Sequence, residues 1–208
     1  MRRSFLFIAM AVAVVVPAIA LGAGPTQIQV KDNSFTPQNP PLRGFQTGAS
    51  FHWQRAASST GNHNVHQDAG LFSSGNPTTG AINYTVSASA GSYHYYCDTH
   101  GSPAGGMTGM VKVRPAFNAA PTGSPFTVIW ADSGTTTGQA FDVNYRVGTS
   151  GAWKVWKNDT AQRQAVFGQA GSPVAVTPGK TYQFQVRSEK GSDHSKRSDF
   201  SPPLSVKP

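Results

Sequence analysis

The segment Tyr93–Val113 constrains the chain most, because it places a thiol, an imidazole and a thioether close together along the sequence. Cys97 is the chain's single cysteine, and it is followed by His100 and, after a glycine-rich stretch, by Met107. Thiolate and thioether are soft ligands and imidazole is borderline, a combination that suits copper better than magnesium or calcium. The loop after Cys97 offers one imidazole, that of His100, and His63 is the best candidate for a second. These residues predict a metal site.

The cysteine count narrows the role of Cys97. A single cysteine excludes an intrachain disulfide. An unpaired thiol is then an intermolecular bridge, a reactive group, a metal ligand or an inert core residue. The histidine and methionine that follow Cys97 favour the ligand role.

The composition indicates the fold class. The 208 residues suffice for two modest domains or one large β domain. Only 12% of the residues are charged, whereas 22 are glycine and 15 are proline. Few charges, many turn-forming residues and many aromatic side chains favour β structure over long helices. We therefore expect an all-β protein.

Residues 1–23 have the three parts of a secretory signal peptide. Arg2 and Arg3 form a positive region, Phe5–Val16 an apolar region, and Ala18–Ala20 an A-x-A cleavage site. A retained membrane anchor is the alternative, but the apolar run is short for a spanning helix and ends at a proline. We expect cleavage, no integral membrane span in the mature chain, and export to the periplasm, the extracellular space or the cell surface.

The net charge of +8 does not predict a nucleic-acid partner. Two of the basic residues, Arg2 and Arg3, belong to the leader, and the others are scattered without a Lys/Arg run. Surfaces that bind nucleic acid need clustered basic side chains. We expect no nucleic-acid binding.

Two β domains are expected after the leader. The first covers residues 24–115, with candidate strands at 26–30, 50–53, 82–86, 93–97 and 110–113. A stretch rich in proline, alanine and glycine predicts a short linker at 116–122. The second domain covers residues 123–208, with candidate strands at 126–130, 140–147, 153–156, 182–187 and 204–206.

Three motifs of the first domain occur in a characteristic order. They are His63-Asn64-Val65 after a strand, the run Gly91–Cys97, and Cys97-x2-His100 closed by Gly106-Met107-Thr108-Gly109. In this order they resemble the plastocyanin/azurin (cupredoxin) family of copper proteins. The resemblance covers nearly the whole first domain and implies a Greek-key β-sandwich.

The resemblance also implies a ligand set. One copper ion, cycling between Cu(I) and Cu(II), is expected to be bound by His63, Cys97, His100 and Met107. Asn64 is expected to lie behind the ligands and to tie the two ligand loops together. The spacing from His100 to Met107 is longer than in plastocyanin, and Met110 is the alternative axial ligand.

The second domain resembles a fibronectin type III domain. The resemblance rests on Trp130, on Tyr145 in a middle strand and on the late pattern Tyr182-x-Phe-x-Val-Arg187. The segment Val176–Tyr182, which leads into a predicted strand, resembles a tyrosine corner. In that motif the tyrosine hydroxyl forms a hydrogen bond with nearby backbone. Both protein binding and glycan binding are open for such a domain, because a fold does not determine a ligand.

The expected function is that of an exported mononuclear type 1 (blue) copper protein that carries single electrons. By resemblance, a redox protein partner docks near His100, where Gly101, Pro103 and Ala104 form a small uncharged patch. The alternatives are a copper-binding or copper-delivery protein without electron transfer, and a cell-surface binding module. An enzyme is not expected, because the chain offers no Ser/His/Asp set and no acid–base carboxylate pair.

Overall fold

The computed structural model describes residues 24–45, 49–123, 125–169, 175–191 and 193–208. The predicted signal peptide, 1–23, lies outside the described residues. Within these ranges the regular structure consists of strands β1 to β16, without an α-helix, which confirms the expected all-β class. The described part of the chain also contains no helix whose length and apolarity would let it cross a membrane.

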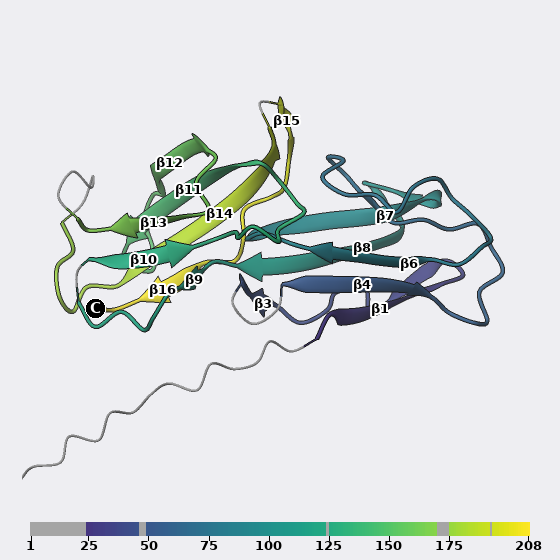
Figure 1. The fold of residues 1–208 in the computed structure, drawn as a ribbon, viewed down its shortest axis with the longest axis horizontal. Coiled ribbons are helices and arrows are strands. Elements are labelled where there is room, and N and C mark those ends of the chain that lie inside the picture. Colours follow the sequence, from purple (N-terminus) through teal and green to yellow (C-terminus); the bar gives the residue numbers. More distant parts are fainter. Residues whose placement is uncertain (1–23, 46–48, 124, 170–174, 192) are drawn as a thin grey trace, which may run out of the picture.

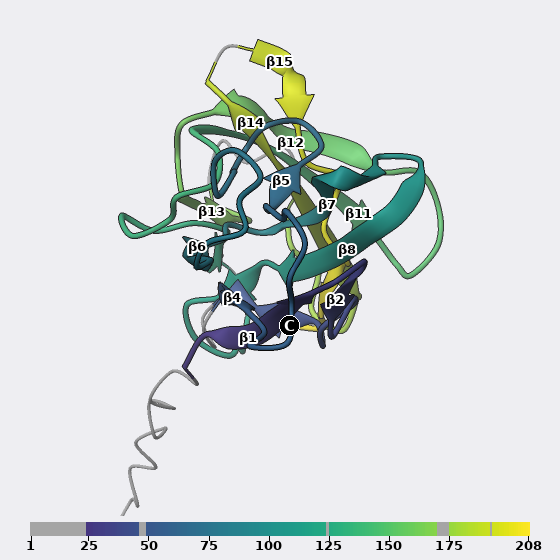
Figure 2. The ribbon, with the colours of Figure 1, turned by 90° about the vertical axis from the view of Figure 1, so that its right-hand side faces the viewer.

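Two facing sheets make up the first unit (Figure 1). One sheet has the order β2-β1-β4-β6, with bounds Ser34–Thr36, Thr26–Lys31, Ser50–Arg55 and Asn83–Ser87. The other has the order β3-β8-β7-β5, with bounds Arg43–Gly44, Gly105–Arg114, Gly91–Ser102 and His66–Gln67. In both views of the ribbon, β1 and β4 lie below β7 and β8 (Figure 2).

Alternating side chains of the two sheets form the first core. In β1 every second residue is buried, and the same period buries Phe51 and Trp53 of β4. Successive side chains of a strand point to opposite faces, so a period of two presents one apolar face to the partner sheet. Tyr93, Tyr95 and Cys97 of β7 belong to the same cluster. Cys97 is therefore part of a packed core that is rich in aromatic side chains.

The second unit also has two sheets. Its smaller sheet has the order β13-β10-β9, with bounds Gln164–Phe167, Phe126–Ile129 and Ala116–Phe117. Its larger sheet has the order β12-β11-β14-β15, with β16 beside β14, and the bounds are Lys154–Thr160, Ala140–Val147, Tyr182–Lys190, Asp193–Arg197 and Leu204–Val206. The sequence placed Ala116 and Phe117 in the linker, but they pair with β10, and Phe117 packs on the second core. A two-residue strand has no periodicity of its own to reveal it.

The corner at Tyr182 has the expected contact. The backbone amide of Thr177 donates to the Tyr182 hydroxyl at 2.8 Å. Tyr182 is buried at the start of β14, so this bond fixes the preceding turn against the second core.

The two units meet directly at the start of β7. Ala90 packs in the second core, and Ser92 exchanges backbone hydrogen bonds with Asp199. The Ser89 hydroxyl lies 2.7 Å from the Tyr93 hydroxyl and 2.5 Å from that of Ser188, and all three residues are buried. β7 leaves this junction and runs toward the opposite end of the first unit (Figure 1). At about 3.3 Å per residue, Cys97 lies about 20 Å from the junction.

Candidate metal centre

Three of the predicted ligands converge at the far end of the first unit. His63 follows a loop, and Cys97 and His100 lie in β7. The thiol of Cys97 and one nitrogen of each histidine all lie within 4.8 Å of one another. Cys97 and His63 are fully buried, whereas His100 is partly exposed.

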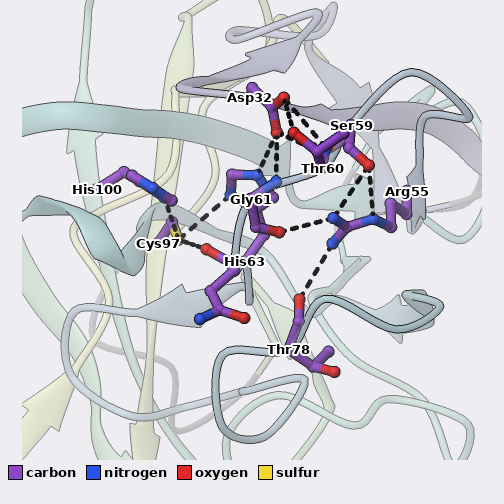
Figure 3. Close-up of polar contacts among 10 residues, drawn as sticks. Asp32, Arg55, Ser59, Thr60, Gly61, His63, Thr78, Cys97 and His100 are labelled. Atoms are coloured by element: carbon purple, nitrogen blue, oxygen red, sulfur yellow. Dashed lines mark hydrogen bonds and ion pairs between the residues drawn. The ribbon is translucent and has the colours of Figure 1, made fainter.

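The two imidazoles present the same nitrogen to the thiol. The distance from Cys97 Sγ to Nδ1 is 3.8 Å for His63 and 3.6 Å for His100 (Figure 3). The ring centroids of the two histidines are 4.7 Å apart. A thiol and two imidazole nitrogens therefore surround one small volume.

A break in strand pairing makes this convergence possible. The register between β7 and β8 shifts between Tyr96 and Gly101, so Cys97 and His100 are free of regular pairing. In a regular strand, residues three apart point to opposite faces. The shift lets both side chains reach the same centre. The segment expected to be a ligand loop is thus the end of the β7–β8 hairpin. Pairing resumes there after the register shift, with Gly101 opposite Gly106.

The two methionines of β8 point to opposite faces. Met107 is 1% exposed and belongs to the core cluster that contains Cys97. Met110 is half-buried, is paired with His94, and lies on the other face of the strand. Of the two candidates for an axial ligand, Met107 is therefore the one on the side of Cys97, and Met110 is not a core residue.

Asn64 joins the segment of His63 to the strand of Cys97. Its side-chain amide donates to Asp98 Oδ2 at 2.6 Å, and its Oδ1 accepts from the Asp98 backbone amide at 2.9 Å. Partial burial favours a raised pKa for Asp98, but the bonds from Asn64 and from His66 outweigh it and hold the pKa below its usual value. The residues that follow the two ligands are thus bonded directly to each other.

The loop before His63 is held from two sides (Figure 3). On one side Asp32 accepts hydrogen bonds from the Ser59 hydroxyl and from the amides of Thr60 and Gly61, at 2.8, 3.0 and 2.9 Å. On the other side the Arg55 guanidinium donates to carbonyl oxygens of the loop and to that of Thr78, at distances between 2.6 and 3.3 Å. Bonds from His63, Gly61, Thr60 and Ser59 hold the pKa of Asp32 far below its usual range.

Sequence reasoning missed the role of Asp32. Asp32 and Asn33 form the turn between β1 and β2, with Asn33 at a φ of 62°. The carboxylate also receives a bond of 2.9 Å from His63 Nε2. No local pattern connects a turn aspartate to a histidine 31 residues away.

A second group of possible ligands lies in the second unit. His194 lies in β15 with its side chain 55% exposed; it donates to Glu189 at 2.7 Å, and Asp159 lies 3.8 Å from its other nitrogen. Glu189 is buried, and the Arg187 guanidinium lies 3.7 Å from it while also binding Asp142. Arg187 compensates Glu189 and Asp142, and His194 lies between Glu189 and Asp159, so we interpret the group as an ion-pair network.

This network predicts a pH-dependent contribution of His194 to stability. The hydrogen bond to Glu189, followed by the charge of Asp159, raises the pKa of His194 above its usual 6.5. The stabilisation is therefore complete below about pH 6.5 and is lost as the pH rises through the folded-state pKa. His194→Gln should lower the free energy of unfolding more at about pH 5.5 than at about pH 9, as measured by urea denaturation. An equal loss at both pH values would contradict the network.

Comparisons with known proteins do not place the chain in a family. No protein-family model matches it. No curated protein matches it either. Among solved structures, the chain is similar to the chicken CNTN1 FN1-FN3 domains, with 10% identity, a TM-score of 0.32 and coverage of 89% of this chain and 68% of that one. A TM-score this low marks a distant likeness between β proteins.

Proposed function

We propose that the chain is an exported mononuclear type 1 copper protein that carries single electrons between redox partners. The observation that carries the proposal is the convergence of Cys97 Sγ with Nδ1 of His63 and Nδ1 of His100, at 3.8 and 3.6 Å. Two imidazoles and a thiolate, with a weak thioether, form the ligand set of blue-copper electron-transfer sites.

The sulfur atom lies close enough to each nitrogen to share one ion with it. Bonds of about 2.3 Å to sulfur and about 2.0 Å to nitrogen can meet only when the two atoms are at most about 4.3 Å apart. Both sulfur–nitrogen distances satisfy this limit. The second nitrogen of His63 is occupied by Asp32, so Nδ1 is the nitrogen left for a metal. These observations support His63, Cys97 and His100 as ligands, with Met107 as the axial one.

Copper, when bound, supplies the one-electron couple between Cu(II) and Cu(I). The protein's own contribution is a centre that changes little between the two states. The buried side chains of Cys97, His63 and Met107 exclude water, and the bonds made by Asn64, Asp32 and Arg55 hold the segment that carries His63. Ligands fixed in this way leave little to reorganise when an electron arrives.

His100 supplies the route to a partner. Of the three converging residues it alone is partly exposed, and its ring lies 4.7 Å from that of His63. In the chain it is followed by Gly101, which is half-buried, and by Pro103 and Ala104, which are exposed; all three are uncharged. A redox protein docking on this end would come close to the metal without touching the second unit, which lies at the other end (Figure 1).

The finer fold assignment is part of the same proposal. We propose a cupredoxin-like Greek-key sandwich for the first unit, supported by the two facing sheets and the order of the ligand motifs. A fibronectin type III-like sandwich for the second unit is supported by its two sheets and by the bond between Thr177 and Tyr182. For this second unit, both a protein ligand and a glycan ligand are compatible with the fold. Export is supported by the leader sequence at 1–23.

The test is the visible absorption and electron spin resonance of the purified chain after addition of Cu(II), beside Cys97→Ser. We expect an intense visible band and a narrow hyperfine splitting in the wild type, together with reversible one-electron voltammetry. Cys97→Ser should lose the band, because the transition requires the thiolate. Circular dichroism of both proteins checks that the fold is unchanged.

A matched pair of methionine variants tests the axial ligand. Met107→Leu should shift the band and the reduction potential, whereas Met110→Leu, on the opposite face of the same strand, should change neither. A pale product with an ordinary tetragonal spectrum in the wild type would overturn the electron-carrier proposal. Copper delivery or a metal-free binding module would then explain the chain better.

A further inference from the structure

The carboxylate of Asp32 is built into the support of His63. A turn between β1 and β2 carries Asp32 to the loop before His63, where every contact made by its two oxygens comes from a donor. A carboxylate accepts and does not donate, so the 2.9 Å contact is a hydrogen bond from His63 Nε2–H.

This bond determines which nitrogen of His63 is left for a metal. With its proton on Nε2, the neutral ring carries its lone pair on Nδ1, the nitrogen that lies 3.8 Å from Cys97 Sγ. His63 is fully buried, so water does not compete for either nitrogen. Asp32 thus sets both the tautomer and the direction of the ring.

The surrounding loop is shaped for the contact. A Cβ at Gly61 would lie 3.0 Å from His63 Nε2 and 3.3 Å from Asp32 Oδ1, so a side chain there would crowd the bond. The Arg55 guanidinium holds the Gly61 carbonyl at 2.6 Å from the other side. The loop, the Asp32 carboxylate and the His63 imidazole are therefore held together by one connected set of hydrogen bonds (Figure 3).

We infer that Asp32 is a positioning residue that acts on the copper couple through His63, directing Nδ1 to the metal and favouring Cu(II) over Cu(I). The inference rests on the proposed function. A carboxylate bonded to the outer nitrogen of a ligating imidazole makes that ligand more basic, and greater ligand basicity favours the more highly charged ion. The Asp32 side chain is 41% exposed, so solvent reduces the effect.

Two other pairs of histidine and aspartate provide the comparison. His94 bonds to Asp68 at 2.8 Å, and His66 bonds to Asp98 at 2.9 Å, both with partly exposed rings. Asp68 belongs to the same unit and carries the same charge, but its histidine is not among the residues that converge on Cys97. Asp68→Asn therefore removes an equal charge without touching the centre.

The experiment measures the reduction potential of copper-loaded wild type, Asp32→Asn and Asp68→Asn. Asn keeps an oxygen for His63 and removes the charge. Asp32→Asn should weaken Cu(II) relative to Cu(I) about tenfold, which for a one-electron couple raises the potential by about 59 mV. Asp68→Asn should change the same ratio less than about twofold, because Asp68 bonds to His94, which is not among the candidate ligands, so its charge acts on the centre only through screened space.

A measurement on the metal-free chain tests the positioning separately. Nitrogen NMR of the His63 ring should show the Nε2–H tautomer in wild type and in Asp32→Asn, and a mixture of tautomers in Asp32→Ala. Equal potentials for Asp32→Asn and Asp68→Asn, or an unchanged tautomer in Asp32→Ala, would overturn the inference. Absence of the blue spectrum from the wild type would instead overturn the proposed function, and the tautomer result would still stand on its own.

Discussion

Trp53→Ala should lower the free energy of unfolding by about 3–5 kcal/mol, the usual range for truncating a fully buried tryptophan. Trp53 is fully buried in β4, and its ring lies 5.2 Å from that of Tyr95 and 5.6 Å from that of Phe72. The surrounding sheets cannot close the space, because neighbouring aromatic rings are held by their own strands. Urea denaturation of the metal-free protein, followed by circular dichroism, measures the loss.

Trp153→Ala is the matched control. Trp153 is half-buried just before β12, and the Arg146 guanidinium lies 4.4 Å from its ring centroid. Losing a cation–π contact that is partly open to solvent costs about 0.5–1 kcal/mol. A loss at Trp53 no larger than the loss at Trp153 would mean that the aromatic cluster of the first unit does not stabilise it as described.

Gly106→Ala should destabilise the metal-free protein by about 2–4 kcal/mol, because it combines overpacking with backbone strain. Gly106 has a φ of +85°, and a Cβ there would lie 2.5 Å from the carbonyl oxygen of His100 and 2.9 Å from Gly101 Cα. Both contacts are with backbone, so a side-chain rotation cannot relieve them. The hairpin that carries His100 and Met107 must therefore move, and the visible band expected for the copper form should shift or disappear.

Gly105→Ala separates the clash from the strain. Gly105 is the neighbouring residue of the same hairpin and also has a positive φ, +153°, but no atom lies within 4 Å of a Cβ built there. Its substitution should cost less than half as much and leave the band in place. Equal effects of the two substitutions, in denaturation and in absorption, would show that the packing against His100 is unimportant.

The longer strands of this protein could be predicted from its sequence. Alternation of apolar residues at 26–30 and 140–147 marked strands that the structure contains, because a period of two presents one face to a core wherever the strand lies. Short strands escaped prediction, among them His66–Gln67 and Gln164–Phe167, since so few residues show no period. Their strand character comes from the partners they pair with.

For the candidate centre, the sequence by itself determined the kinds of ligand available, because a single thiol followed by an imidazole and a thioether restricts the metals that can bind. Only the tertiary structure decided that His63 lies beside Cys97, that Met107 and not Met110 is on the side of the thiol, and that Asp32 supports His63. The physical reason is distance along the chain. Contacts between residues 31 or 34 positions apart depend on strand register, a shifted pairing and the packing of two sheets, and no local pattern encodes them.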